Sequence, residues 1–356
     1  MTSRVGTRVV AHRGAGAALP ENTLVGFEHT VLGGLADGVE FDVQRTADGA
    51  LVVLHDETLD RTTDVAEVFP GRRADRVETF TSGELAALDC GGWYEPNPQV
   101  GERIPNLVEV LDLCAGAVDV LLELKRPAAF PGIEQDVLDA LDAIPRARER
   151  VTVTSFDLTA LARIRALRTD IRLCASVRTS AGWHLDDVVG LGRDVSLAPS
   201  WDRRDLSLAR DAGLSVTVGA LNSPRRLRRA LDEGIGSIVT DFPAQACALR
   251  DGRTGDESPL AIHRISCERR GAPIRVAVVN GGEADVDLAG WRVAVGGVAI
   301  PLSVDHDRLG GGQILSVMVP AARLDNATFH SVALWSPSRT VAGFEEFSLP
   351  AVPGNA

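Results

Sequence analysis

The first 250 residues alternate short runs of β-branched and other apolar residues with longer amphipathic segments. This alternation is typical of βα units, in which helices cover a buried parallel sheet. Strands are predicted at Arg8–Ala11, Gly38–Val43, Asp119–Leu124, Val151–Thr154, Ile171–Ala175, Asp194–Ala198, Ser215–Val218 and Ser237–Val239. Eight such units close a TIM-type (β/α)8 barrel, a fold of about 250 residues.

Helices are predicted between those strands, where apolar residues recur at helical spacing. They span Thr23–Gly33, Gly132–Ala143, Leu158–Leu167, Arg203–Ala212 and Pro224–Asp232. Between the second and third strands, Asp48-Gly49 favours a tight turn, and an irregular stretch continues to Ile104. We expect this insertion to lie over the C-terminal face of the barrel.

A polar, breaker-rich segment, Asp251–Pro259, separates this pattern from a different one. The following strands are predicted at Ile274–Val279, Val286–Leu288, Trp291–Val295, Val298–Leu302, Ile314–Val319, Ser331–Trp335 and Thr340–Glu345. Turn residues separate them, a pattern that favours an all-β, immunoglobulin-like sandwich. The sequence therefore predicts a barrel at residues 1–250, a linker at 251–259 and an accessory sandwich at 260–356.

Composition narrows the classes of partner. The chain of 356 residues carries a formal net charge of −12, which argues against a nucleic-acid partner because phosphate neutralisation requires a basic face. Its N-terminus has no apolar signal region, and no apolar run reaches the roughly 18 to 20 residues of a membrane span. We expect a cytoplasmic protein without stable membrane insertion.

The counts of lysine and cysteine are both unusual enough to interpret. Of 37 basic residues, Lys125 is the only lysine. A planar guanidinium cannot replace a compact ammonium at every site, so a chemical role is one explanation for the single lysine at Lys125. The other explanation is that this lysine was kept by chance. The five cysteines are odd in number and lack Cys-x-x-Cys spacing, which favours buried reduced thiols over disulfides or a zinc site.

Two predicted strands carry charged residues on one face. Side chains alternate along a strand, so Glu40 and Asp42 share a face, as do Glu123 and Lys125. Adjacent carboxylates are costly unless a cation or proton offsets their charge, and a divalent metal would do so. Solvated edge acids and a structural ion pair are the alternatives.

Two histidines follow predicted strands: His12 closes the first strand, and His55 closes Leu51–Leu54. We expect both at the C-terminal ends of strands, where barrel active sites lie. A pair of imidazoles suits acid–base catalysis, although a single histidine in such a place is often a structural hydrogen-bonding group. The remaining histidines are assigned no role: His29, His184, His263, His306 and His330.

Several phrases, taken together, resemble the glycerophosphodiester phosphodiesterase family. They are VVAHRGAGAALPENTLVGF, DGVEFDVQRTADGALVVLHDETLDRTTD, IPNLVEVL, LLELKRP, VTSFD and IVTDFP. The resemblance extends in order along the whole first domain. It implies a (β/α)8 barrel that cleaves a small-molecule phosphodiester to an alcohol and glycerol phosphate.

The resemblance also implies roles for individual residues. Glu40, Asp42 and Glu123 match its ligands for a divalent metal ion, Mg²⁺ or Ca²⁺. His12 and His55 match its catalytic pair, and Arg13 and Lys125 match its phosphate-binding cations. Glu21 matches a further acid whose role stays open. A phospholipase D-like or cyclic-phosphate-forming lipid phosphodiesterase, or an inactive barrel that serves as a binding protein, are the alternatives.

One position departs from the family pattern. Relatives usually carry Trp-Thr-x-Asn after the seventh strand, where this chain has Gly219-Ala220-Leu221-Asn222. Loss of the indole removes one wall of the substrate pocket. Trp93, Trp183 or Trp201 could replace it, although each also suits ordinary packing.

The accessory domain shows a weaker resemblance. Its phrase VVNGGEADVDLAGWRV resembles the immunoglobulin-like domain of lamin tails over roughly 80 residues. We find no catalytic cluster in the sequence of this domain. We expect it either to pack on the barrel or to bind a partner of unknown kind.

Overall fold

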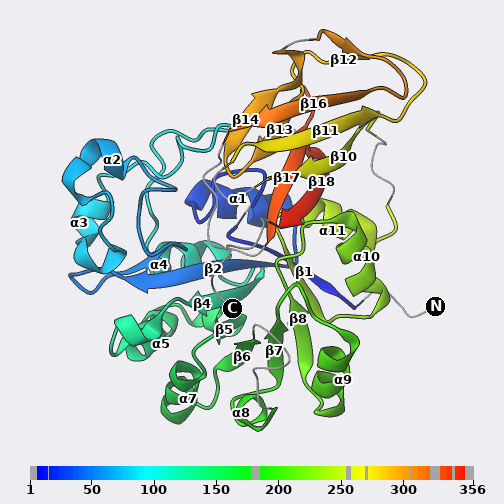
Figure 1. Cartoon of the computed structure of the whole chain (residues 1–356). Coiled ribbons are helices and arrows are strands. Elements are labelled where there is room, and N and C mark those ends of the chain that lie inside the picture. Colours follow the sequence, from blue (N-terminus) through cyan, green and yellow to red (C-terminus); the bar gives the residue numbers. More distant parts are fainter. Residues whose placement is uncertain are drawn as a thin grey trace.

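The structure is a computed structural model that describes residues 6–14, 16–177, 185–253, 258–268, 272–304, 306–320, 329–338 and 341–348. A helix-covered barrel forms the larger body, and an all-β domain packs against one side of it (Figure 1). Trp183 and His184, two residues considered above, lie outside the described residues.

Eight parallel strands close the barrel. They are β1 (Arg8–Ala11), β2 (Gly38–Arg45), β4 (Asp119–Leu124), β5 (Val151–Ser155), β6 (Arg172–Val177), β7 (Asp194–Leu197), β8 (Ser215–Val218) and β9 (Ser237–Thr240). The order is β1-β9-β8-β7-β6-β5-β4-β2, and pairing of β1 with β2 closes the ring. The predicted (β/α)8 barrel is confirmed, with strand ends that agree to within two residues.

Helices cover the barrel from outside. They are α1 (Leu24–Gly33), α4 (Leu107–Cys114), α5 (Ile133–Ala143), α6 (Pro145–Arg148), α7 (Leu158–Leu167), α8 (Leu185–Val189), α9 (Arg203–Asp211), α10 (Pro224–Asp232) and α11 (Pro243–Arg250). Thr23 caps α1, because its side chain accepts a hydrogen bond from Gly26 N. This cap fixes where α1 begins, so the preceding residues Glu21 and Asn22 stay at the barrel mouth.

Strand β2 shows how the barrel separates its two faces. Val39, Phe41 and Val43 are fully buried in the main apolar core. Phe41 meets Phe27 of α1 edge to face, with ring centroids 5.6 Å apart. The alternate residues, Glu40 and Asp42, therefore point away from the helix layer and into the barrel.

The insertion after β2 has a small core of its own. It contains β3 (Leu51–Val53), α2 (Val65–Val68) and α3 (Ser82–Leu85). Strand β3 pairs antiparallel with the C-terminal end of β2, from Val43 to Arg45. Strands β2 and β3 therefore form a β-hairpin, and β3 is not a strand of the barrel. His55 follows the C-terminal end of β3 and lies at the mouth because the hairpin turns back there, with Leu54 N donating to Asp42 O.

The accessory domain consists of antiparallel sheets. One sheet has the order β10 (Leu260–Ser266), β11 (Ile274–Asn280), β16 (Ile314–Val319), and a second has β14 (Val298–Pro301), β13 (Arg292–Val295), β17 (Phe329–Trp335), β18 (Val341–Ser348). A two-stranded sheet joins β12 (Val286–Asp287) and β15 (Arg308–Leu309). A separate apolar core fills this domain, in agreement with the predicted sandwich.

Strands β10 and β15 were not predicted. Strand β10 changes register between Ile262 and Arg264, which breaks the alternation that predicts a strand, and β15 has only two residues.

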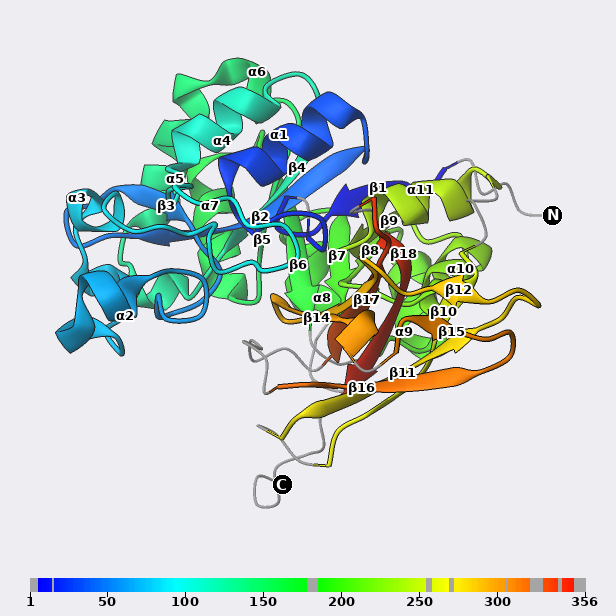
Figure 2. The same cartoon turned by 90° about the horizontal axis from the view of Figure 1, so that it is seen from above.

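The accessory domain packs on the barrel beside β8, β9 and α11 (Figure 2). Phe344 of β18 stacks on Phe242, with ring centroids 4.1 Å apart. Glu346 forms an ion pair with Arg226 of α10, at 2.5 Å. The expectation that this domain packs on the barrel is confirmed.

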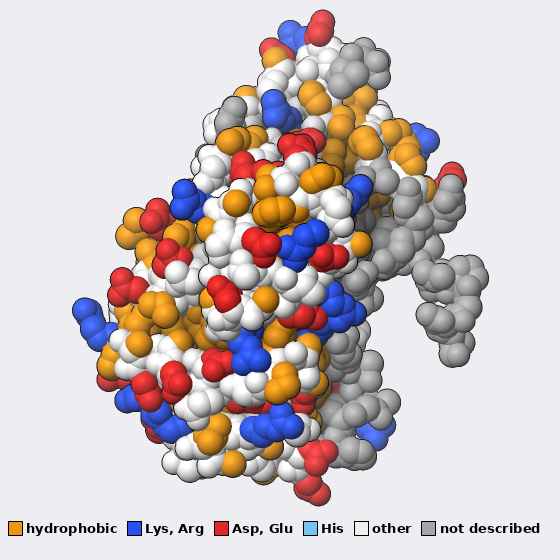
Figure 3. Space-filling view, turned by 90° about the vertical axis from the view of Figure 1, so that its left-hand side faces the viewer, with side chains coloured by type: hydrophobic (Ala, Val, Ile, Leu, Met, Phe, Trp, Pro, Cys, Tyr) orange, Lys and Arg blue, Asp and Glu red, His pale blue; other side chains and the backbone are white. Residues whose placement is uncertain are grey.

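Acidic and basic side chains are interspersed on the face shown in Figure 3. In the insertion, Arg72 pairs with both Asp75 and Glu84. The five cysteines are free thiols, and all but Cys267 are buried. Within the described segments, no helix combines the length and the hydropathy that crossing a membrane requires.

Candidate active site

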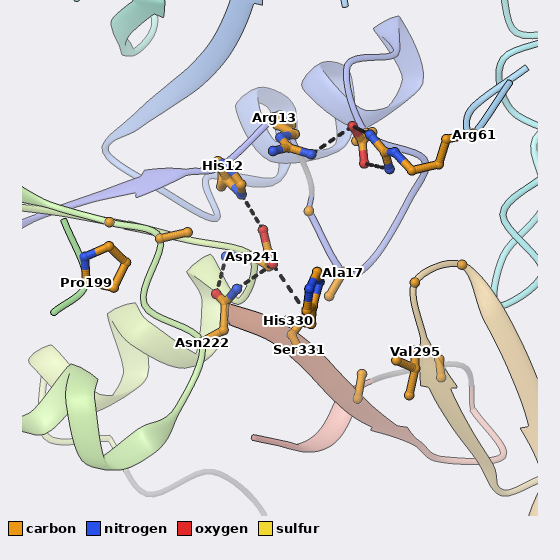
Figure 4. Close-up of a pocket in the computed structure, with 18 of the residues that line it drawn as sticks. His12, Arg13, Ala17, Arg61, Pro199, Asn222, Asp241, Val295, His330 and Ser331 are labelled. Atoms are coloured by element: carbon orange, nitrogen blue, oxygen red, sulfur yellow. Dashed lines mark hydrogen bonds and ion pairs between the residues drawn. The ribbon is translucent and has the colours of Figure 1, made fainter. Parts of the chain in front are cut away.

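A cavity of about 580 Å³ opens at the carboxyl ends of the barrel strands. Residues of three regions line it: the barrel loops, the insertion and the accessory domain. Figure 4 shows His12 and Arg13 on one side of this space, with Ser331 and Val295 of the accessory domain across from them. The carboxyl ends of barrel strands are where catalytic residues of this fold gather.

Three carboxylates form a cluster beside the cavity. Glu40, Asp42 and Glu123 each offer an oxygen atom, and these atoms lie within 4.8 Å of one another. Glu40 and Asp42 are buried, and Glu123 is half-buried. The cluster follows from strand register, because Asp42 of β2 pairs directly with Glu123 of β4.

The cluster is electrostatically strained without a further cation. Burial, and then the neighbouring Asp42 carboxylate, raise the pKa of Glu40 to about 8. Burial also acts to raise the pKa of Asp42, but Lys125, His55 and Arg13 outweigh it and lower that pKa. An additional positive charge would allow all three carboxylates to be ionised together.

The donor set fits a hard divalent cation. Three carboxylate oxygens from two adjacent strands suit Mg²⁺ or Ca²⁺, which prefer oxygen ligands, better than a metal that prefers thiolate or imidazole. The residues predicted from the sequence as metal ligands are therefore brought together, in an arrangement that can hold such an ion.

Lys125 bridges two members of the cluster. Its Nζ lies 2.7 Å from Glu123 Oε1 and 3.0 Å from Asp42 Oδ1. Burial lowers the pKa of Lys125, but the two carboxylates raise it by more, so the ammonium stays charged. The chain's only lysine thus lies in the group of residues that the sequence singled out.

His12 is held by an acid from the far end of the barrel sequence. Its Nδ1 lies 2.6 Å from Asp241 Oδ1, and its Nε2 lies 3.9 Å from Glu40 Oε2. Asn222 donates to Asp241 Oδ2 at 2.5 Å and accepts from Asp241 N at 2.9 Å. Burial and Arg13 lower the pKa of His12, but Asp241 and Glu40 outweigh them and raise it.

His55 has a parallel arrangement with its sequence neighbour. Its Nδ1 lies 2.6 Å from Asp56 Oδ1. Arg61 donates to Asp56 Oδ2 through Nε at 2.5 Å. Burial acts to raise the pKa of Asp56, but its hydrogen bond with His55 and the charge of Arg61 lower it. Each histidine therefore has one nitrogen fixed by a carboxylate, which orients the other nitrogen.

Glu21 connects two guanidinium groups. Arg13 donates to Glu21 Oε1 at 3.0 Å, and Arg61 donates to both carboxylate oxygens at 2.6 and 2.7 Å. Arg13 itself adopts a left-handed backbone (φ 52°), and its N–H donates to Glu40 Oε2 at 3.0 Å. Such a conformation in a non-glycine residue is strained and is often found at functional sites.

All eight residues predicted for the site lie at this mouth. They are His12, Arg13, Glu21, Glu40, Asp42, His55, Glu123 and Lys125. Four supporting residues were missed: Asp241, Asp56, Asn222 and Arg61. Asp241 lies in the IVTDFP phrase, and Asp56 directly follows His55, so both had a readable signal. Asn222 matches the asparagine of the Trp-Thr-x-Asn phrase and Arg61 lies in the DETLDRTTD phrase, so these two also had a readable signal.

The position that departs from the family pattern has no room for a side chain. A Cβ added at Gly219 would lie 2.4 Å from Val239 Cβ. Trp93 lines the cavity, so of the proposed replacements it alone among the described residues is placed to contact a ligand. Trp201 is buried, and its indole N–H donates to Glu233. His330, which was assigned no role, also lines the cavity.

Comparison with known proteins places the chain among enzymes of one kind. Residues 12–245 match the Glycerophosphoryl diester phosphodiesterase family. A glycerophosphodiester phosphodiesterase of Bacillus altitudinis is 32% identical over 253 residues, which cover 69% of this chain and 98% of the relative.

Solved structures agree with this match. The crystal structure of a glycerophosphodiester phosphodiesterase from Agrobacterium tumefaciens is 26% identical, with a TM-score of 0.56, and the match covers 68% of this chain and 99% of that one. A phosphodiesterase of Oleispira antarctica, solved in complex with the product sn-glycerol-3-phosphate, is 25% identical with a TM-score of 0.59, over 68% of this chain and 96% of that one. This chain belongs to the glycerophosphoryl diester phosphodiesterase family.

Proposed function

We propose that this protein hydrolyses a glycerophosphodiester to an alcohol and glycerol phosphate with the help of a divalent cation. The observation that carries the proposal is the three-carboxylate cluster beside two histidines, each of which is held by its own carboxylate. Family membership and the activities named for the relatives support the same reaction. The oxygen of a water molecule forms a bond to phosphorus, and the bond between phosphorus and the alcohol oxygen breaks. The departing alcohol oxygen takes up a proton.

Glu40, Asp42 and Glu123 would hold the cation, Mg²⁺ or Ca²⁺. When bound, it would offset negative charge on the phosphoryl oxygens, which is a large contribution to catalysis in a pocket with little water. Glu40 must lose its proton for this role, and the nearby positive charge would favour that loss.

Arg13 and Lys125 would bind the phosphate. Both side chains lie beside the carboxylate cluster: Lys125 contacts Asp42 at 3.0 Å, and Arg13 Nε lies 3.7 Å from the same carboxylate. A phosphate placed over the cluster would meet two fixed positive charges. Glu21, through its bonds to Arg13 and Arg61, would fix the direction of the first guanidinium.

His12 and His55 would move protons. One would accept a proton from the attacking water, and the other would donate a proton to the departing alcohol oxygen. The bond from Nδ1 to Asp241 or Asp56 leaves Nε2 of each ring as the nitrogen that can exchange a proton with the reacting groups.

A direct assay tests the proposal. The full chain is incubated with glycerophosphoglycerol in ¹⁸O-labelled water, with Mg²⁺ or Ca²⁺ or with a chelator, and the products are followed by ³¹P NMR and mass spectrometry. We expect glycerol phosphate carrying one ¹⁸O atom, formed only with the metal. Turnover that is insensitive to the chelator would refute metal dependence, and a cyclic phosphate product would refute attack by water.

A further inference from the structure

The barrel covers one face of an accessory-domain sheet that would otherwise meet water. In the sheet β14-β13-β17-β18, the residues Val293, Val295, Val332 and Leu334 fill the core of the sandwich. The alternate residues Ala294, Ala333 and Trp335 are buried with Ala17 and Phe242 of the barrel. We call the barrel-facing side chains Ala294, Ser331, Ala333, Trp335, Phe344 and Glu346 the outer face.

The outer face is fixed to the barrel by polar contacts as well. Asn222 N donates to Glu346 Oε2 at 3.2 Å, on the loop that follows β8. On the other side of the cavity, Glu95 N donates to Gly297 O at 2.9 Å, and Ala299 N donates to Glu95 Oε2 at 2.9 Å. The domain is therefore held at two places around the mouth, once by a barrel loop and once by the insertion.

Part of the outer face lines the cavity that contains His12. Ala294, Ser331 and Ala333 all line it, together with the turn residues Gly296 and Gly297. Ser331 Oγ donates to Asp241 Oδ2 at 3.4 Å, and Asp241 is the carboxylate that holds His12 (Figure 4). The outer face thus lies on the His12 side of the candidate phosphate position.

The barrel supplies no side chain at Gly219, the position that departs from the family pattern. Gly219 lines the same cavity, and Val239 excludes any larger residue there. Small residues on the outer face leave the space between the two walls open. The shape of the cavity on this side is therefore set by the accessory domain.

We propose that the outer face is a specificity-determining surface of the active site, against which one organic group of the phosphodiester packs. The proposal rests on the proposed function. Ala294, Ala333 and Ser331 carry no charge, so the surface suits an uncharged group of about the size of glycerol, with methylene contacts to the alanines and a hydroxyl near Ser331. The members of the outer face that line the cavity, Ala294, Ser331 and Ala333, offer no ion pair to a choline or ethanolamine nitrogen, and Glu346 is paired with Arg226.

The test enlarges one alanine and measures binding in three steps. Ala294→Leu is compared with Ala261→Leu, the same change at an exposed position of β10. In the presence of Mg²⁺ or Ca²⁺, the inhibition constants of inorganic phosphate and of sn-glycerol 3-phosphate are measured, and then the KM of glycerophosphoglycerol. These probes carry no, one and two organic groups. Ala294→Val is smaller by one carbon and serves if leucine prevents folding.

We expect Ala294→Leu to raise the KM of glycerophosphoglycerol about tenfold or more, because added carbons in a packed space are poorly tolerated. The inhibition constant of inorganic phosphate should stay within about twofold of the wild-type value, and Ala261→Leu should change none of the constants. A parallel rise for glycerol 3-phosphate would assign the surface to the glycerol group. A rise for the diester alone would assign it to the alcohol.

Two results would overturn the inference. One is an unchanged KM in both Ala294 variants, and the other is equal weakening of inorganic phosphate, which would indicate a general disturbance of the site. Failure of the proposed function is distinguishable from both. In that case the wild-type chain itself would release no glycerol phosphate, and the same comparison would be made by calorimetric binding of the three probes.

Discussion

The ammonium of Lys125, the residue that follows strand β4, lies 2.7 Å from Oε1 of Glu123, two positions earlier in the chain. A compact ammonium fits between Glu123 and Asp42, whereas a planar guanidinium is broader. We expect Lys125→Arg to lower kcat at least about tenfold despite the conserved charge. The kinetics of this variant would be compared with those of Arg163→Lys, the reverse exchange at an exposed position of α7. Wild-type activity in Lys125→Arg would show that charge alone suffices.

Glu40→Gln should remove a metal ligand while keeping the shape of the side chain. We expect kcat to fall at least about 100-fold and calorimetric binding of Mg²⁺ or Ca²⁺ to weaken, with an unchanged circular dichroism spectrum. Glu28→Gln on the exposed surface of α1 is the matched control. Near-normal kcat in Glu40→Gln would remove Glu40 from the proposed site.

His12 and Asp241 should act as a unit. His12→Ala is expected to lower kcat at least about 100-fold, the scale of losing a proton-transfer group. Asp241→Asn should lower kcat while leaving KM and metal affinity close to wild type, because Asp241 acts through its bond to His12 and is not one of the three clustered carboxylates. The double variant should be little worse than His12→Ala, and full additivity of the two effects would contradict the assignment.

Glu21 should make stability depend on pH. Burial acts to raise its pKa, but Arg13 and Arg61 outweigh burial, so its folded-state pKa lies below the ordinary value of 4.5. A depressed pKa stabilises the folded state above that ordinary value, and this contribution is lost as the pH falls through the folded-state pKa.

Urea unfolding at several pH values should therefore show a difference between wild type and Glu21→Gln that narrows below about pH 4.5. The exposed exchange Glu67→Gln is the control. A difference that stays constant down to acid pH would contradict the ion-pair account of Glu21.

Gly219→Ala should destabilise the protein. The added methyl group would lie 2.4 Å from Val239 Cβ, a distance that forces either β9 or the segment after β8 to move. We expect a loss of about 1 to 3 kcal/mol in the free energy of unfolding. Gly71→Ala, where the new carbon meets no atom within 4 Å, is the control. A Gly219→Ala protein as stable as wild type would show that the backbone around Val239 can move at no cost, and would contradict this prediction.

The sequence predicted those parts of the site that follow from local rules. Alternation along each strand places Glu40 and Asp42 on a shared face of one strand, and Glu123 and Lys125 on a shared face of the next. The contact between His12 and Asp241 depends on closure of the barrel, which brings β9 beside β1 across 229 positions. No local pattern contains that distance, so Asp241 was overlooked although its phrase was recognised.

The docking of the accessory domain had a signal that was not used. Solvent-facing positions of a strand are usually polar, yet Ala294, Ala333 and Phe344 are apolar on the face opposite to the sandwich core. Two apolar faces on one sheet indicate a second packing partner. The domain limits at residues 250 and 260, the resemblance to lamin tails and the cytoplasmic location stay predictions.

The stacking of Phe344 on Phe242 has a consequence for how the two domains are made. If the domains separated, an aromatic and alanine-rich strip would be exposed along a sheet, and such strips favour aggregation. Joining both domains in one polypeptide keeps the effective concentration of each near the other high, so a transient opening closes before another molecule can bind there.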